Sequence, residues 1–453
     1  MSKKEWRFEG AFTDISDKGF GVCRAPDGRT AFVADALPGE EGTVKVIKEY
    51  KNYVIGKMEE LKVASPHRIQ PDCTVFRRCG GCIYRHLDYQ AELEYKRKGV
   101  EEVLKRVGGV SVSVPMPLSG KEKEYRNKLL LPVGKRDGEL VCGFYAPHSH
   151  SIIPCDKCLL HTDDFSQISA GLLQLLKGKN PYDEATGKGL LRHIYLRRNG
   201  KGEFCVTVIV NGKRLPSAEE TAELLMARFP QVKSFYVNLN VSRTNNVTGP
   251  DWVHIKGEKL LTQELLGKTF KMSPAAFFQV NTEMTEKLYA TAAEMADIRK
   301  GETVFDMYCG IGTVGLCLCP DGVELCGVEI VPAAIENARQ NAILNGRSEK
   351  DTKFFACDAA EGFERCYNAF GKKPTTVLLD PPRAGLAPSL TETLIKERPE
   401  KIVYISCNPA TLARDVALLK DGGYSFADIA TVDMFPRTGH VESVVCLTRR
   451  LDN

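Results

Sequence analysis

The strongest constraint on the fold is a regular alternation of strand-like and helix-like segments after about residue 300. Apolar runs such as ETVFD, VELCGVE and TVLLD are each followed by a segment of helical character. This alternation is typical of a parallel sheet with helices on both faces. We therefore expect a doubly wound α/β sheet, whose ligands bind at the carboxyl ends of the strands.

A glycine-rich turn follows the first of these strands, which ends near Asp306. In ETVFDMYCGIGTVGLCL, the spacing of Gly310, Gly312 and Gly315 has the form G-x-G-x-x-G. Glycines at this place let the backbone approach a nucleotide cofactor at a helix N-terminus. The pattern alone fits both a dinucleotide and S-adenosylmethionine.

Acidic residues end all four strands that begin this half of the chain. Besides Asp306, Glu329 closes the second strand, Asp358 follows the third and Asp380 follows the fourth. Any one of them fits a helix N-cap, a structural role that aspartate favours. Four acids along the ligand-binding edge of one sheet instead favour binding of a ribose and an amine, and we expect a methyltransferase-type sheet that binds S-adenosylmethionine.

Cys407 stands at a strand-to-helix joint in YISCNPATLARD. Asn408 is a good N-cap and Pro409 a good first helical residue, so Cys407 precedes the positive end of a helix. We expect this position to lower the pKa of the thiol and to favour the thiolate. A buried structural thiol is the alternative, because free cysteine is often buried.

Several motifs in this half resemble those of the RNA uracil-5 methyltransferase family. AAFFQVN precedes the glycine-rich turn, and LLDPPRAGL, SCNPATLARD and GHVESVV follow it in this order. The resemblance covers nearly the whole chain and implies a class I S-adenosylmethionine-dependent fold. It also implies that a cysteine adds to carbon 6 of uracil, which makes carbon 5 able to take a methyl group. A base then removes the carbon 5 proton so that the cysteine leaves.

The resemblance assigns a role to individual residues. Cys407 is expected to be the nucleophile, Glu442 in GHVESVV the base, and Phe277 a contact of the uracil. Without the resemblance, Glu442 reads as a surface charge and AAFFQV as core packing. The cofactor-binding residues expected in the same way are Gln279, Tyr308, Gly310, Glu329, Asp358 and Asp380.

Sixteen cysteines are many for a chain of 453 residues. A chain of this length has its own apolar cores and does not resemble a small secreted domain built on disulfides. We therefore expect most of the cysteines in apolar stretches to be free, small buried side chains. This group comprises Cys317, Cys319, Cys326, Cys357 and Cys446.

A separate group, Cys73, Cys79 and Cys82, has the spacing C-x5-C-x2-C. Loop thiols at such spacing suit a site of four thiolates, so a fourth ligand is needed. Cys155 and Cys158, in IIPCDKCLLH, both compete for that place. The family resemblance implies a [4Fe-4S] iron–sulfur cluster with Cys158 as the fourth metal ligand, and a four-cysteine zinc site is the alternative.

The N-terminal part has the features of an RNA-binding segment. Five short alternating runs separated by glycines fill the first 60 residues and predict a small β-barrel. GFGV, LPGE and EGTVKV within it resemble the TRAM domain, a small RNA-binding module. Residues 61–130 then carry 14 Lys and Arg against 8 Asp and Glu, a net charge of +6 compared with +4 for the whole chain. This distribution favours a polyanion such as RNA, and a solvated helix face is the alternative.

We therefore predict a multidomain α/β protein of three parts. An OB-like TRAM β-barrel spans 1–62, and an α+β central domain with the cysteine group spans 63–86 and 124–270. A Rossmann-like class I methyltransferase domain spans 87–123 and 271–453. A helix within its first segment is expected to pack back on the sheet.

The predicted activity is methylation of a uridine at carbon 5 in structured RNA, with 23S rRNA as the expected substrate. The barrel and the cysteine group favour rRNA, because the tRNA-directed bacterial branch of the family generally lacks both. A tRNA methyltransferase and a non-catalytic iron–sulfur RNA-binding protein are the alternatives. The sequence has no membrane-length apolar run, no signal-peptide pattern and no evident obligate protein partner, so we expect a cytoplasmic protein.

Overall fold

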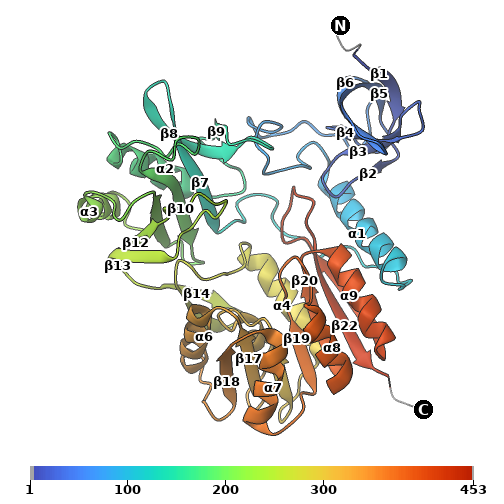
Figure 1. Cartoon of the computed structure of the whole chain (residues 1–453), viewed down its shortest axis with the longest axis vertical. Coiled ribbons are helices and arrows are strands. Elements are labelled where there is room, and N and C mark those ends of the chain that lie inside the picture. The colour runs from blue at the N-terminus through green and yellow to red at the C-terminus, as the bar shows by residue number, and fades with distance from the viewer. Residues whose placement is uncertain (1–4, 451–453) are drawn as a thin grey trace.

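The computed structural model describes residues 5–450, so the first four and last three residues of the predicted outer domains lie outside the described part. Figure 1 shows three groups of strands, with the N-terminal group at one end of the molecule and the C-terminal group at the other. The helix α1 (Tyr89–Arg106) runs between the N-terminal strands and the C-terminal part, beside α9 (Pro409–Asp421). No helix among residues 5–450 is long and apolar enough to cross a membrane.

The N-terminal sheet has six strands in the order β1-β5-β6-β4-β3-β2. Alternate side chains point into a small apolar core that includes Phe8, Val33 and Val54. The sequence predicts five strands, and the sheet has six because the first run, WRFEGAFTDIS, contains two strands. The end of this run forms the short β2, which pairs with the next strand along the chain. The strands are β1 (Arg7–Ala11), β2 (Asp14–Ile15), β3 (Gly21–Arg24), β4 (Thr30–Ala34), β5 (Glu41–Glu49) and β6 (Tyr53–Val63).

The central sheet has seven strands in the order β13-β12-β11-β10-β7-β8-β9, and only the β11–β12 pair is parallel. Its core is completed by apolar side chains of α2 (Asp163–Leu175) and α3 (Ala218–Arg228). The strands are β7 (Lys128–Arg136), β8 (Glu139–Tyr145), β9 (Ile152–Pro154), β10 (Leu191–Arg198), β11 (Phe204–Val210), β12 (Val232–Leu239) and β13 (Asp251–Gly257).

The C-terminal sheet confirms the predicted doubly wound fold. Its order is β18-β17-β16-β19-β20-β22-β21, in which the first five strands are parallel and β22 is antiparallel to both neighbours. The strands are β16 (Thr303–Asp306), β17 (Glu324–Glu329), β18 (Thr352–Ala356), β19 (Thr376–Leu379), β20 (Lys401–Ser406), β21 (Tyr424–Val432) and β22 (Glu442–Arg449). A separate hairpin, β14 (Leu261–Leu265) and β15 (Lys268–Met272), precedes it.

Helices cover both faces of this sheet because successive side chains of its buried strands point to opposite sides. Ile405 of β20 packs in the core formed with α4, α5 and α6, whereas Tyr404 packs in the core formed with α1, α7, α8 and α9. The helices not yet given are α4 (Thr282–Ala296), α5 (Thr313–Leu318), α6 (Pro332–Leu344), α7 (Ala359–Phe370) and α8 (Pro388–Glu397).

One cysteine expected to be free is not. Cys326 of β17 forms a disulfide with Cys366 of α7, with the Cα atoms 5.7 Å apart. The helix packs on the strand, so two buried cysteines that are 40 residues apart in sequence face each other. Cys319, Cys357 and Cys446 are free and buried as expected, and Cys317 is free and half-buried.

Candidate active site

A cavity of about 1020 Å³ lies at the carboxyl edge of the C-terminal sheet. All the residues that the sequence predicted for catalysis, cofactor binding and uracil contact line it, although they are spread over more than 160 positions of the chain. They are Phe277, Gln279, Tyr308, Gly310, Glu329, Asp358, Asp380, Cys407 and Glu442.

The glycine-rich turn forms one wall of the cavity. Gly310 has a φ of +55°, and a Cβ atom added there would meet no atom within 4 Å, so the backbone is open toward the cavity. Asp306 lies beneath the turn and does not line the cavity; its Oδ2 accepts a hydrogen bond from Gly315 N at 2.9 Å. Burial raises the pKa of Asp306 to about 7. Asp306 therefore holds the turn in place.

The other strand-end acids differ in how they are held. Glu329 accepts a hydrogen bond from Val331 N at 3.0 Å. Asp358 is the N-cap of α7 and accepts from Ala360 N at 2.9 Å, so it has the capping role as well as a place in the cavity wall. Asp380 is half-buried at the end of β19, and its partial removal from water raises its pKa to about 7.

Cys407 and Glu442 lie at adjacent ends of two antiparallel strands. The register of β20 and β22 pairs Ser406 with Ser443. Cys407 directly follows Ser406, and Glu442 directly precedes Ser443, so the two residues come next to each other at the ends of the paired strands. Asn408 caps α9 by accepting from Ala410 N at 3.1 Å, as the sequence predicted. The sheet thus brings together two residues that are 35 positions apart.

The expected low pKa of Cys407 is wrong for this structure. Burial raises the pKa of the thiol, the neighbouring Glu442 and Asp380 raise it further, and only Arg383 among the nearby charges lowers it. Desolvation here outweighs the position before a helix. Glu442 is itself buried, not a surface charge: burial, and secondarily Asp380, raise its pKa to about 8, against the opposing effect of Arg383.

Arg383 was not predicted as a site residue, although it lies in the motif LLDPPRAGL. It lines the cavity, and its Nη2 lies 3.3 Å from His440 Nε2. Its carbonyl oxygen accepts a hydrogen bond from Asn408 Nδ2 at 3.0 Å. The positive charge of this guanidinium lowers the pKa of both Cys407 and Glu442, against the effect of their burial.

A second cavity, of about 390 Å³, contains the predicted cysteine group. Cys73, Cys79, Cys82, Cys155 and Cys158 all line it. Within residues 5–450, no three Cys, His, Asp or Glu side chains are arranged to hold a single metal ion. The predicted metal ligands are therefore gathered around one space without converging on one point.

Cations surround the thiols of this second cavity. Arg85 is buried and pairs through Nη1 with Asp72 at 2.7 Å, while its Nε and Nη2 have no hydrogen-bond partner in the described chain. Lys128 also lines the cavity, and burial followed by repulsion from Arg197 and Arg126 lowers its pKa to about 8. Such a site fits an anionic group, because buried N–H donors without hydrogen-bond partners are costly.

The family model of tRNA (uracil-5-)-methyltransferase matches residues 88–450, and that of the TRAM domain matches residues 11–58. The chain belongs to the tRNA (uracil-5-)-methyltransferase family. Members share S-adenosylmethionine-dependent methyl transfer to uracil carbon 5, so the chain is an RNA methyltransferase that uses this cofactor. The resemblance inferred from the motifs is confirmed, as is the TRAM domain.

Relatives and a solved structure cover nearly the whole chain. The chain is 40% identical to an uncharacterized RNA methyltransferase of Halalkalibacterium halodurans, over 97% of this chain and 96% of the relative. It is 39% identical to one of Listeria monocytogenes, over 99% and 98%. It is also similar to the tRNA (uracil-54, C5)-methyltransferase of Pyrococcus abyssi in complex with S-adenosyl-L-homocysteine, with 27% identity, coverage of 97% and 100%, and a TM-score of 0.78.

Proposed function

We propose that this enzyme methylates carbon 5 of a uridine in 23S rRNA, with Cys407 as nucleophile and Glu442 as base. The placement of these two residues at adjacent strand ends, inside the cavity that the glycine turn and strand-end acids border, carries the proposal. A thiol and a carboxyl group on the same side of a cofactor cavity match the two protein groups that the reaction requires.

The steps follow from the chemistry of uracil. The Cys407 thiolate adds to carbon 6, and the electron pair of the 5,6 double bond moves toward the carbonyl oxygen to give an enolate. When bound, S-adenosylmethionine would supply an electrophilic methyl group to carbon 5 and would leave as a neutral thioether. Glu442, as a carboxylate, then removes the carbon 5 proton, and the returning electron pair expels Cys407. Arg383 favours the thiolate because its positive charge lowers the pKa of Cys407.

The cavity walls fit the cofactor and the base. Glu329 presents a carboxylate at the end of the second strand, where an acid suits a ribose diol. Gly310 leaves room for close approach, and Phe277 is 68% exposed although it lines the cavity. An exposed aromatic ring suits stacking on a flipped-out uracil. Gln279, Tyr308, Asp358 and Asp380 complete the proposed cofactor site.

We further propose a [4Fe-4S] cluster held by Cys73, Cys79, Cys82 and Cys158. Thiolates that bind a cubane attach to four different irons, so they surround a volume and do not converge on one point as zinc ligands do. The buried Arg85, whose Nε and Nη2 have no hydrogen-bond partner in the described chain, and the neighbouring Lys128 fit the negative charge of such a group. Cys155 lines the same cavity and is the alternative fourth ligand, and zinc is the alternative metal.

The choice of RNA has two candidates. The TRAM domain and the basic segment after it favour a large structured RNA, and we propose 23S rRNA on this basis. The second candidate is tRNA, because the similar Pyrococcus abyssi enzyme is named for a tRNA uridine. A protein that binds RNA without methylating it is the remaining alternative. A cytoplasmic location stays a prediction.

The deciding experiment is to map 5-methyluridine by mass spectrometry in rRNA and tRNA from cells with and without this gene, and from cells complemented with Cys407→Ala. The proposal predicts loss of the modification from 23S rRNA only, restored by the wild type and not by the variant. Loss from tRNA supports the second candidate. No change in either RNA supports binding without catalysis.

A further inference from the structure

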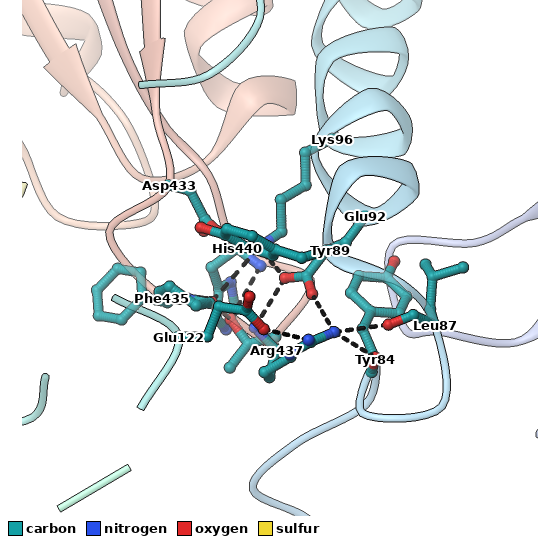
Figure 2. Close-up of polar contacts among 12 residues, drawn as sticks. Tyr84, Leu87, Tyr89, Glu92, Lys96, Glu122, Asp433, Phe435, Arg437 and His440 are labelled. Atoms are coloured by element: carbon teal, nitrogen blue, oxygen red, sulfur yellow. Dashed lines mark hydrogen bonds and ion pairs between the residues drawn. The ribbon is translucent and has the colours of Figure 1, made fainter. Parts of the chain in front are cut away.

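A buried network of charged side chains joins α1 to the loop that precedes Glu442 (Figure 2). The loop, residues 433–441, connects β21 to β22, and the register pairs Val432 with Glu442 at its base. The proposed base is therefore the first residue after the loop. Contacts that hold this loop in place therefore also fix the position at which β22 begins.

Lys96 ties the start of the loop to the helix. Its Nζ donates to Glu92 Oε1 at 2.7 Å and to Asp433 Oδ1 at 2.8 Å, and the Tyr89 hydroxyl donates to Asp433 Oδ2 at 2.8 Å. The side chains of Lys96, Glu92 and Asp433 are at most 2% exposed. Removing one partner of such a buried pair leaves an uncompensated charge, so the arrangement is strongly specified.

Arg437 ties the middle of the loop to the same helix. Its backbone N–H donates to Glu92 Oε1 at 2.7 Å, and its Nη1 donates to the Leu87 carbonyl oxygen at 2.6 Å. Its Nη2 forms an ion pair with Glu122. Arg437 also has a φ of +71°, a conformation that few residues other than glycine adopt. Such strain persists only where surrounding contacts hold it, and it is concentrated at functional sites.

Arg437 contacts the cysteine segment too. Its carbonyl oxygen accepts hydrogen bonds from Ile83 N at 2.9 Å and Tyr84 N at 3.2 Å, directly after Cys82. On the opposite side of the loop, Phe435 lines the active-site cavity, and His440 contacts Arg383. The loop therefore lies between the cysteine segment and the proposed reaction centre.

We propose that Arg437 and Lys96 are positioning residues that fix loop 433–441 and thereby place the Glu442 carboxylate for removal of the carbon 5 proton. Neither residue is among those that line the cavity, so both act through the loop. This inference rests on the proposed role of Glu442 as base. It predicts a defect in one step: proton removal slows, whereas addition of Cys407 and methyl transfer proceed.

The test is a single-turnover methylation assay on the transcript, 23S rRNA or tRNA, that the wild-type protein methylates, with the covalent protein–RNA adduct quantified over time. In Arg437→Lys and Lys96→Met, we expect adduct formation within about threefold of wild type and adduct decay at least about tenfold slower. Arg97→Met is the matched control. Arg97 is the next residue on α1 but pairs with Glu94 and Glu101, away from the loop, and its adduct should decay at the wild-type rate.

The outcomes separate this inference from the proposed function. Normal adduct decay in both variants, or equal slowing of formation and decay, overturns the positioning role. If Glu442→Gln accumulates adduct while both variants decay normally, the base assignment stands and only the inference fails. If Glu442→Gln itself accumulates none, the base assignment fails and the inference falls with it. Glu92→Gln combined with Lys96→Met, which removes opposite charges together, replaces any single variant that does not fold.

Discussion

Cys407 and Glu442 lie side by side across β20 and β22 because Ser406 pairs with Ser443 in the antiparallel register. This relationship requires β22 to return against the otherwise parallel strands, between β20 and β21. The geometry accounts for the raised pKa values of both groups, since Glu442 is buried, Cys407 is half-buried, and the two face the same cavity as Asp380.

Glu442→Gln should allow methyl transfer but block release of the enzyme from RNA, because glutamine cannot accept the carbon 5 proton. A denaturing gel with labelled RNA should show a persistent adduct. In the wild type, adduct decay should accelerate as the pH rises through about 8, because the carboxylate is the active form and its pKa is raised to that value. A decay rate that is independent of pH from 6 to 9 argues against this role.

Glu442→Gln should also stabilise the fold at alkaline pH. The folded-state pKa of Glu442 is raised above its unfolded value, so above about pH 4.5 the unfolded chain binds fewer protons and the free energy of unfolding falls as pH rises to about 8. Relative to wild type, the variant should gain on the order of 3 kcal/mol between pH 5 and pH 8 in denaturant melts. Asp380→Asn should show the same trend up to about pH 7.

Glu324 is a carboxyl group whose pKa is shifted in the opposite direction to that of Glu442. Its pKa is lowered, with burial opposing the stronger combined effect of bonds to Thr303 and Lys372. Glu324 therefore contributes to the free energy of unfolding above its unfolded-state pKa, and this contribution is lost as the pH falls through its folded-state pKa. Glu324→Gln should therefore be destabilising at neutral pH and become neutral in acid. The same trend in Glu324→Gln as in Glu442→Gln argues against the assignment of either shift.

Glu329→Gln should weaken cofactor binding about tenfold to a hundredfold, because a charge-assisted hydrogen bond to a ribose hydroxyl is lost. Calorimetry with S-adenosylhomocysteine measures this directly. Glu324→Gln is the control, since Glu324 is the first residue of the same strand, at the end opposite to Glu329, and pairs there with Lys372. Equal affinities for the Glu329 variant and wild type remove Glu329 from the cofactor site.

Substitution of the cavity cysteines should identify the fourth ligand. Cys158→Ser should abolish the brown colour and the iron and sulfide content of anaerobically purified protein, whereas Cys155→Ser should retain them. Cys317→Ser, a half-buried free thiol outside this cavity, is the control. If only Cys155→Ser loses iron, Cys155 is the fourth ligand and Cys158 is not. A colourless wild-type protein that contains one zinc contradicts the cluster.

Much of the fold and site was predictable because the signals are local. Strand–helix alternation gave the C-terminal sheet, and Asn408 and Pro409 gave the start of α9. The raised pKa of Cys407 was not predictable, since burial depends on residues brought in by other strands. The Cys326–Cys366 disulfide was not predictable either, since its two cysteines are 40 positions apart. The role of Arg437 was also not predictable, since its partners on α1 lie more than 300 positions away.

The most direct test of the central claim is mass spectrometry of the complex trapped with 5-fluorouridine-substituted RNA and S-adenosylmethionine. Fluorine at carbon 5 cannot be removed as a proton, so the adduct should accumulate in the wild type and in Glu442→Gln. The account predicts that the RNA fragment is attached to the peptide containing Cys407, carries one methyl group, and is absent from Cys407→Ala. Attachment to another residue, or full methylation activity in Cys407→Ala, would contradict it.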